Sequence, residues 1–326
     1  MVILKCLQAT LVAAGLLALS GTTLAQGFPS SRITVIVPFP PAGGPDVIAR
    51  LVNSKLSENL KLPVIIENRP GAGSMVGSDY VKKAAPTGYT LLHASATFSL
   101  SPSLYVNSTN SYDPARDFQP ITQLVNGWAI LMVPAQSPVR SVADLVALGK
   151  QKTKGLSFGS AGSGTGNHLL GEMFRLATGL NLVHVPYKGS APALQDMVGN
   201  SLDFMFDPMS SSINLVRSGK LRAIGLATRV RTPVLPDVPT MAETGYPSVE
   251  LDQWQGVIAP KGTPRDIVAR LQQEYVKAVR SPDVQSRIED IGVVVSTSNP
   301  QDFQVQIERE IVKLGKLVKD ANIKVE

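Results

Sequence analysis

Two glycine-rich loops are the segments of this sequence best suited to bind a small ligand. They cover residues 38–46 (PFPPAGGPD) and residues 159–167 (GSAGSGTGN). Each follows a short apolar run with β-strand character and precedes a segment in which apolar residues recur at helical spacing. The first N–H groups of a helix have no acceptor within the helix, and the helix dipole is positive at that end. We therefore expect each loop to hold an anion, most simply a carboxylate, although either loop alone would also serve as a tight turn.

The second loop has the residue types that backbone recognition of a carboxylate requires. Gly162, Gly164 and Gly166 let a ligand approach the main chain closely. Ser163 and Thr165 can add hydroxyl donors. We expect residues 162–167 to bind the carboxylate mainly through their backbone N–H groups.

Several more specific motifs are incomplete. A dinucleotide-binding G-x-G-x-x-G would need glycine at Asn167, and no Gly-Lys-Ser/Thr closes this loop as in a nucleotide-binding P-loop. His168 and Glu172 would share a helix face, but a chain with three His and one Cys is poorly equipped for a metal centre. We expect no metal, no cofactor and no nucleophile–base–acid set, and we expect His168 to cap or pack at the helix start.

The rest of the chain alternates strands and helices that would position these loops. Strands are expected at residues 32–37, 63–67, 89–93, 130–133, 156–158, 182–185, 204–206 and 223–227. Helices are expected at residues 46–60, 76–85, 142–150, 168–177, 193–198, 267–278 and 303–318, with an irregular, proline-rich stretch at 232–248. This alternation indicates an α/β protein in which helices flank mainly parallel sheets. In such sheets ligands bind at the carboxyl ends of the strands, where both loops lie.

Length and composition favour two folded domains in an exported protein. The chain has 326 residues, of which 44 % are hydrophobic and 17 % charged, so wholesale disorder is excluded. Near the N-terminus, Lys5 precedes an apolar run at residues 11–19, and small residues end at Ala25. This pattern predicts a cleaved signal peptide at residues 1–25 and delivery to the periplasm. Cys6 would leave with the signal, so the mature chain would contain no disulfide.

The positive charge is modest and diffuse. Lys and Arg number 31 and Asp and Glu 25, which gives 31 − 25 = +6. No run of five or six basic residues occurs. A nucleic-acid surface would need a concentrated basic patch, so we expect no nucleic-acid partner.

Six ordered segments make the chain resemble a known family. They are PF…GG-P-DVIAR from Pro38, ENRPGAG from Glu67, GYTLL from Gly88, GSGT with HL from Gly162, HVPYKG from His184 and LPDVPT from Leu235. The sequence resembles the substrate-binding proteins of tripartite tricarboxylate transporters, often called the Bug family. The resemblance covers nearly the whole chain after the signal segment. It implies a two-domain periplasmic binding protein of the Venus-flytrap kind, type II-like.

The resemblance also implies domains and ligand-binding residues. Residues 27–126 with 249–326 would form one discontinuous domain, and residues 127–248 the other. The expected ligand-binding residues are Phe39, Ala42, Gly43, Gly44, Asp46, Ser95, Thr97, Gly162, Ser163, Gly164, Thr165, His168, Tyr187 and Asp207. Ala42 stands where the family often has Gly, and Pro45 where it commonly has Ser or Thr, so one N–H and one hydroxyl are missing here. Proline suits the first helical turn, so the helix should survive.

The sequence and the resemblance together predict a receptor and not an enzyme. It would capture a small carboxylate between its domains by domain closure and deliver it to the membrane permease subunits of a tripartite transporter. A monomer is expected. One alternative is a sensor-type receptor that presents the ligand to a signalling partner, and a more remote one is a secreted hydrolase that uses His168.

Overall fold

The computed structural model describes residues 27–106, 108–320 and 323. The predicted signal peptide, residues 1–25, lies outside the described residues. The chain from Ser31 onward forms one compact unit that contains two β-sheets with helices packed on them.

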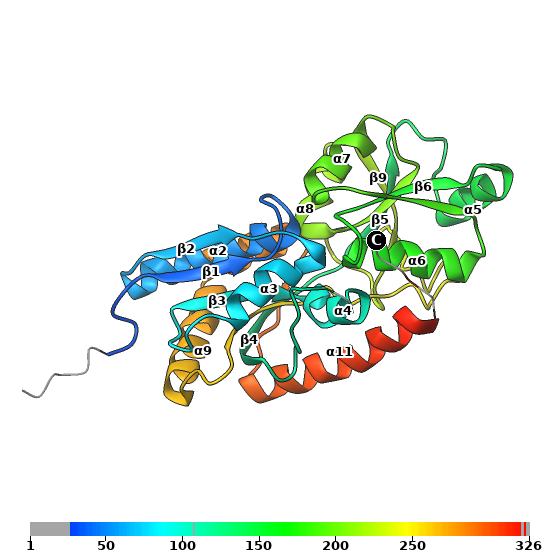
Figure 1. Cartoon of the computed structure of the whole chain (residues 1–326). Coiled ribbons are helices and arrows are strands. Elements are labelled where there is room, and N and C mark those ends of the chain that lie inside the picture. Colours follow the sequence, from blue (N-terminus) through cyan, green and yellow to red (C-terminus); the bar gives the residue numbers. More distant parts are fainter. Residues whose placement is uncertain (1–26, 107, 321–322, 324–326) are drawn as a thin grey trace, which may run out of the picture. The chain divides into compact units, whose positions relative to one another are not determined.

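The first sheet has six strands in the order β11-β4-β10-β3-β1-β2 (Figure 1). Their bounds are β1 (Ile33–Val37), β2 (Val64–Asn68), β3 (Thr90–Ser95), β4 (Phe118–Asn126), β10 (Gln255–Pro260) and β11 (Val294–Val295). The helical elements in the same parts of the chain are α2 (Gly44–Leu60), η1 (Ala72–Ser74), α3 (Met75–Lys82), α4 (Ala96–Leu104), α9 (Arg265–Val279), α10 (Pro282–Asp290) and α11 (Pro300–Asp320). In the parallel register of β1, Val35 lies opposite Ile66 of β2 and Leu91 of β3.

The second sheet has five strands in the order β7-β6-β8-β5-β9. Their bounds are β5 (Ala129–Pro134), β6 (Leu156–Ser160), β7 (Leu182–Pro186), β8 (Phe204–Pro208) and β9 (Leu221–Leu226). The helices between these strands are α5 (Val142–Gln151), α6 (Gly166–Thr178), α7 (Ser190–Val198) and α8 (Met209–Arg217). No helix or named strand is assigned to the described residues between β9 and β10, in agreement with the proline-rich composition there.

The two-sheet α/β architecture is confirmed, but both sheets are mixed where mainly parallel sheets were expected. β1, β2 and β3 pair in parallel, whereas β10, β4 and β11 pair antiparallel. In the second sheet β6 is parallel to β7 and β8, and β5 is antiparallel to β8 and β9. Strands β4 and β5 are separated only by Gly127 and Trp128. The chain therefore passes straight from the first sheet to the second at this point.

Regular apolar spacing explains why the elements pack as they do. In β1 the side chains of Ile33 and residues 35–37 are fully buried, as expected for a strand covered on both faces. In α2 the buried positions Ile48, Val52 and Leu56 recur every four residues and form one helix face.

Helix α11 contributes to the cores of both sheets. Its Phe303 and Ile307 pack with Trp254 and residues of the first sheet. Its Leu314 and Val318 belong to the core cluster of the second sheet. In Figure 1 this helix, drawn in red, runs beside α4, against which it packs. The helix therefore links the two sheets along one side.

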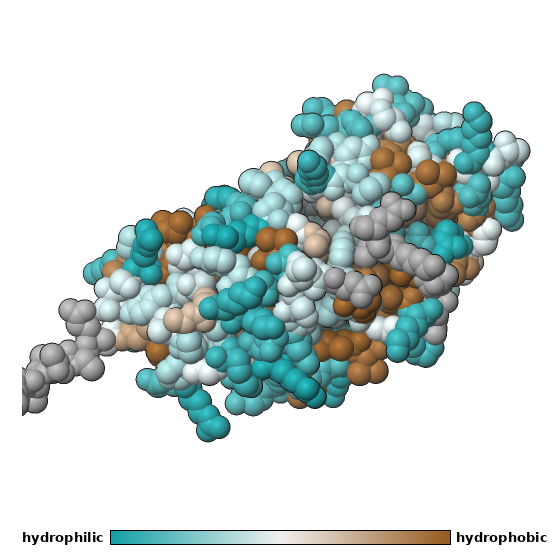
Figure 2. All heavy atoms as spheres, viewed as in Figure 1, coloured by the Kyte–Doolittle hydropathy of each residue, from teal (hydrophilic) through white to brown (hydrophobic). Residues whose placement is uncertain are grey.

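The face of the molecule drawn in Figure 2 carries hydrophobic side chains in several areas. Figure 2 shows a mostly hydrophilic or neutral face with scattered brown areas. Val106 and Val312 are the most exposed large hydrophobic residues among the described ones, at 74 % each. In the described part of the chain, no helix is both long and apolar enough to span a membrane.

Candidate functional site

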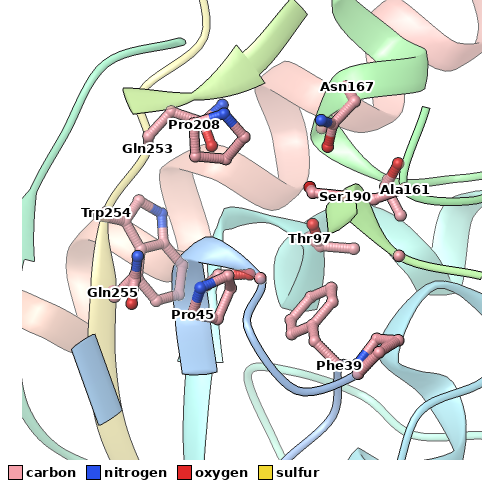
Figure 3. A pocket seen from close by; sticks show the side chains of 16 residues that line it. Phe39, Pro45, Thr97, Ala161, Asn167, Ser190, Pro208, Gln253, Trp254 and Gln255 are labelled. Carbon is pink, nitrogen blue, oxygen red and sulfur yellow. The ribbon is translucent and has the colours of Figure 1, made fainter. Parts of the chain in front are cut away.

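A pocket lies where the N-terminal ends of several helices meet, and we call it the helix-end pocket (Figure 3). The first sheet's elements contribute residues at the starts of α2 and α4. The second sheet's elements contribute residues at the starts of α6 and α7 and just before α8. Its lining residues are Phe39, Pro40, Gly43, Pro45, Ser95, Thr97, Ala161, Thr165, Gly166, Asn167, Gly189, Ser190, Pro208, Gln253, Trp254 and Gln255.

The helix-end pocket owes its electrostatic character to backbone groups. None of the described residues that line it has a charged side chain. The first-turn N–H groups of the helices that begin at Gly44, Ala96, Gly166 and Ser190 have no acceptor within their helices. Each helix start also carries a partial positive charge of roughly half an elementary charge. The pocket is therefore suited to a small anion, without a lysine or arginine to bind it.

A second, larger pocket adjoins the first, and we call it the neighbouring pocket. The two share four lining residues, which are Phe39, Pro40, Ala161 and Thr165. The neighbouring pocket is also lined by η1 and the residues before it, by Tyr105 and Tyr187, and by the exposed Lys188. The centres of water-sized molecules can occupy about 40 Å³ of the helix-end pocket and about 350 Å³ of the neighbouring pocket. The helix-end pocket thus accepts a compact group, and the neighbouring pocket can accept the rest of a longer molecule.

Eight of the fourteen expected ligand-binding residues line one or both of these pockets. They are Phe39, Gly43, Ser95, Thr97, Gly162, Ser163, Thr165 and Tyr187. The other six line neither pocket. They are Ala42, Gly44, Asp46, Gly164, His168 and Asp207. The contacts of these six show what each does in place of lining the pocket.

Asp46 holds the first loop together. One carboxylate oxygen accepts hydrogen bonds from the Ala42 N–H at 2.9 Å and from Arg50 at 2.8 Å. The other accepts from the amide of Asn68 at 2.8 Å. Burial alone would raise the pKa of Asp46, but these donors outweigh burial and hold that pKa below its usual value. Both oxygens accept hydrogen bonds from the protein, so Asp46 stabilises the first loop, and its contact with a ligand stays a prediction.

Ala42 and Pro45, which differ from the residues common in the family, leave the start of α2 intact. Pro45 occupies the first turn of the helix, which begins at Gly44 as expected for proline at this place. Ala42 has φ = 63°, in the left-handed region that glycine adopts more easily. Its N–H is held by Asp46, and the residue faces a separate groove beside α7 and α8. Gly44 lies so near Ser210 that a Cβ atom would be 2.6 Å from its Oγ, so it provides a close approach between elements.

The second loop uses several of its own N–H groups internally. Gly162 N–H donates to Ser160 Oγ at 3.1 Å, and Gly164 N–H donates to His168 Nδ1 at 3.1 Å. Thr165 donates to the Gly162 carbonyl through its hydroxyl at 2.7 Å. The N–H groups of Gly162 and Gly164 therefore donate within the protein here, and binding of a carboxylate by residues 162–167 stays a prediction. The donors at this side of the pocket are the first N–H groups of α6, at Gly166 and Asn167.

His168 and His184 form a stacked pair behind this loop. Their ring centroids are 4.0 Å apart, and His184 Nε2 lies 2.7 Å from Ser160 Oγ. Burial lowers the pKa of His168, and burial together with His168 lowers the pKa of His184 to about 3. His168 accepts from the Gly164 N–H, so it caps the loop as the sequence suggested and is not placed as a ligand contact.

Asp207 is a fully buried carboxylate that gathers three side-chain donors. Its Oδ1 accepts from Asn167 at 2.8 Å and from Ser190 at 2.6 Å, and its Oδ2 accepts from the Ser211 hydroxyl. Burial raises the pKa of Asp207 to about 6 although these donors act in the opposite direction. Asp207 is therefore a positioning residue for the starts of α6, α7 and α8.

Other lining residues went unpredicted because their neighbours come from distant parts of the chain. Gln255 on β10 lies 2.9 Å from the buried His93 Nε2 on β3. Gln253, Trp254 and Gln255 reach the pocket from the segment that returns to the first sheet after residue 248. The sequence alone did not indicate that residues 253–255 line the pocket.

The family model described as "Tripartite tricarboxylate transporter family receptor" (TctC) matches residues 48–323. This match extends over most of the chain and includes elements of both sheets. The chain belongs to the TctC family of receptors.

Three solved structures are similar to this TctC-family receptor over nearly their full lengths. The periplasmic binding protein BugD has 33 % identity and a TM-score of 0.87, with 92 % of this chain and 100 % of BugD covered. Rpa4515 of R. palustris with adipate has 34 % identity and a TM-score of 0.87, covering 91 % and 99 %. MatC (Rpa3494) from Rhodopseudomonas palustris with bound malate has 31 % identity and a TM-score of 0.84, covering 89 % and 100 %. The receptor is thus a solute-binding protein whose relatives bind carboxylates.

This receptor belongs to a family of binding proteins and is not an enzyme. One G-x-S-x-G pattern, at residues 155–159, resembles a hydrolase nucleophile motif. Its Ser157 lies inside β6, however, and its hydroxyl donates to Asp203 Oδ2 at 2.9 Å. A nucleophile elbow needs a sharp turn between strand and helix, which this position does not provide. Among the described residues, no three His, Cys, Asp or Glu side chains are grouped closely enough to hold a metal ion.

Proposed function

We propose that this receptor captures a small organic carboxylate in the helix-end pocket and delivers it to the membrane permease subunits of a tripartite transporter. The observation that carries the proposal is the convergence of helix N-termini from both sheets on a pocket without charged side chains. Such helix starts supply N–H donors and positive potential to an anion. The adipate and malate bound by two relatives support a carboxylate as the ligand class.

The sizes of the two pockets support one orientation of the ligand. The helix-end pocket has room for a compact group, so one carboxylate would lie there. The remainder of the ligand would extend past Phe39 into the neighbouring pocket, towards Lys188. Charge-assisted hydrogen bonds from the N–H groups, worth roughly 1.5–3 kcal/mol each, would outweigh a screened contact with exposed Lys188 of about 0–1 kcal/mol.

Domain closure is part of the same proposal. The strands of the first sheet come from residues 33–126 and 255–295, and those of the second from residues 129–226. This supports a division into a domain of residues 27–126 with 249–326 and a domain of residues 127–248. Tyr105 at the end of α4 donates to the Ser163 carbonyl at 2.7 Å and thereby joins the two parts beside the pocket. Such a contact would form when the domains close on the ligand.

Location and assembly state follow the proposed function. The lysine, apolar run and small residues near the N-terminus support export by a signal peptide of residues 1–25. BugD, a similar protein, is a periplasmic binding protein. We propose that the receptor works in the periplasm as a monomer.

A ligand screen tests the proposed function. The protein is unfolded and refolded to remove bound ligand, then tested by thermal shift against mono-, di- and tricarboxylates and their neutral amides. We expect a subset of the acids to raise the melting temperature, since ligand at 100 times its Kd stabilises a protein by about 2.7 kcal/mol. The amides should be much weaker. Shifts by the amides and by no acid would contradict the proposal.

A pair of matched variants locates the binding site in the same experiment. Thr97→Val removes a hydroxyl that lines the helix-end pocket. Thr178→Val makes the same change at the far end of α6, where the hydroxyl donates to the Phe174 carbonyl. We expect Thr97→Val to weaken binding about five- to tenfold and Thr178→Val to leave it unchanged.

A further inference from the structure

Asn167 lies at the second position of α6, where its side chain reaches the helix-end pocket. Its amide nitrogen donates to the Phe206 carbonyl at 2.9 Å and to Asp207 Oδ1 at 2.8 Å. A carbonyl and a carboxylate are both acceptors, so the amide group must present its nitrogen and both of its hydrogens to β8. The orientation of the amide is therefore fixed by chemistry.

The oxygen of Asn167 is consequently left on the pocket side. Figure 3 shows it on the side that faces Ser190 and Thr97. No hydrogen bond from another described residue reaches this oxygen, and it is not among the fully buried unpaired atoms. Asn167 Oδ1 is therefore an acceptor that is open to the helix-end pocket.

The helix-end pocket also contains several hydrogen-bond donors. Besides the helix N–H groups, the pocket contains the amide of Gln255, whose Oε1 lies 2.9 Å from His93 Nε2. The buried Nδ1 of His93 has no partner, and an orphaned N–H there would be more costly than an orphaned lone pair. The proton therefore lies on Nε2, Gln255 Oε1 accepts it, and the Gln255 nitrogen remains a donor. Asn167 Oδ1 is thus an acceptor whose orientation is fixed by the two hydrogen bonds of its own amide nitrogen.

An acceptor that cannot reorient, such as Asn167 Oδ1, weakens the binding of a carboxylate whose oxygen lies beside it. It repels the anion, and it stays unpaired once the ligand has displaced water. A ligand that carries a hydroxyl close to its carboxylate removes both costs, because the hydroxyl donates to Asn167 Oδ1 while the carboxylate accepts from the helix N–H groups. An ammonium group would also donate, but its charge is opposed by the positive helix ends, and no anionic side chain lines the pocket.

We propose that the ligand is a hydroxycarboxylate and that Asn167 recognises its hydroxyl group. The inference rests on the proposed function, because it takes the helix-end pocket as the carboxylate site. It adds a specificity-determining residue and a narrower chemical class of ligand.

Calorimetry with matched acids tests the inference. The probes are lactate against propionate, malate against succinate, and 2-hydroxyglutarate against glutarate, with aspartate as the amino counterpart of malate. We expect at least one hydroxy acid to bind the wild-type protein about tenfold or more tightly than its plain partner, and aspartate to bind more weakly than malate. Equal or weaker binding of the hydroxy acid in every pair that binds would overturn the inference and leave the proposed function standing. Absence of binding by any acid would overturn both.

Two variants assign the preference to Asn167. Asn167→Ala removes the acceptor, so the ratio of the affinities for the hydroxy acid and its plain partner should fall to about one, whatever happens to the affinity for both. Ser211→Ala also takes a donor away from Asp207, but Ser211 does not line the helix-end pocket, so the preference should persist. Circular dichroism checks the folding of both variants. A folded Asn167→Ala protein that keeps the full preference would show that another group recognises the hydroxyl. The wild-type comparison remains decisive even if a variant does not fold.

Discussion

Buried polar side chains set the orientation of the groups that face the pocket. Asp46 holds the first loop, His168 holds the second, and Asp207 holds the starts of the helices around it. Both carboxylates have their oxygens occupied by protein donors, and His168 accepts from the Gly164 N–H through Nδ1. We therefore expect them to act on a ligand mainly through the backbone and the side chains that they position.

We expect His168 to make the stability of the protein depend on pH. Its Nδ1 accepts from Gly164, and burial lowers its pKa, so the fold favours the neutral ring. Stability from this group is complete above the unfolded pKa of about 6.5 and is lost as the pH falls below that value. His184 beside it acts in the same direction. In His168→Asn, the side-chain oxygen can replace Nδ1 as the acceptor without titrating.

The measurement is urea unfolding of wild type and His168→Asn at pH 7.5 and pH 5.5. Each titrating group changes the free energy of unfolding by at most about 1.4 kcal/mol per pH unit. We expect the variant to lose less stability than wild type between the two pH values. Equal losses would show that His168 binds protons equally in the folded and unfolded chain over this range, so that its pKa is not lowered by folding.

Helix starts are the elements on which the account depends, and the sequence revealed only some of them. The loops at residues 38–46 and 159–167 were recognisable because β-branched strands, glycines and helical spacing follow one another there. Helix α4 was missed because it contains Pro102 and many Ser and Thr residues. Helix α8 was missed because it is short and begins with three serines after Met209. Tertiary packing overrides weak helix propensity at both places.

Gly164 lies where the second loop packs against the end of α4. It has φ = 74°, and a Cβ atom there would lie 2.8 Å from the ring of Tyr105 and 3.2 Å from Leu104. Gly164→Ala should therefore displace either the second loop or the end of α4. We expect a loss of about 2–3 kcal/mol of stability from backbone strain and crowding together. Ligand binding should weaken as well, because the loop leads into α6.

Gly179→Ala is the matched control, because it separates backbone strain from crowding. Gly179 ends α6 with φ = 67°, and a Cβ atom there would meet nothing within 4 Å. This variant should lose only about 1 kcal/mol and keep its ligand affinity. Chemical unfolding and calorimetry on both variants decide the matter, and identical effects on ligand affinity would contradict the role given to Gly164.

At the scale of the whole molecule, contacts distant in sequence build the site and were the least predictable part. Pairing of β10 with β4 helps to place residues 253–255 at the pocket, although other lining residues, such as Phe39, lie more than 200 positions earlier in the chain. Helix α11 joins the cores of both sheets, although its sequence shows only an amphipathic helix. The α/β class and the two ligand loops follow from local patterns. The mixed sheets and the Asn167–Asp207 contact follow from how the segments meet.

The most direct test of the central claim is a crystal structure of the receptor with the ligand that it retains through purification. We predict a carboxylate in the helix-end pocket, within hydrogen-bond distance of the first N–H groups of helices from both sheets. No lysine or arginine side chain should contact that carboxylate. A ligand bound outside this pocket, or one whose uncharged end lies at the helix starts, would contradict the account.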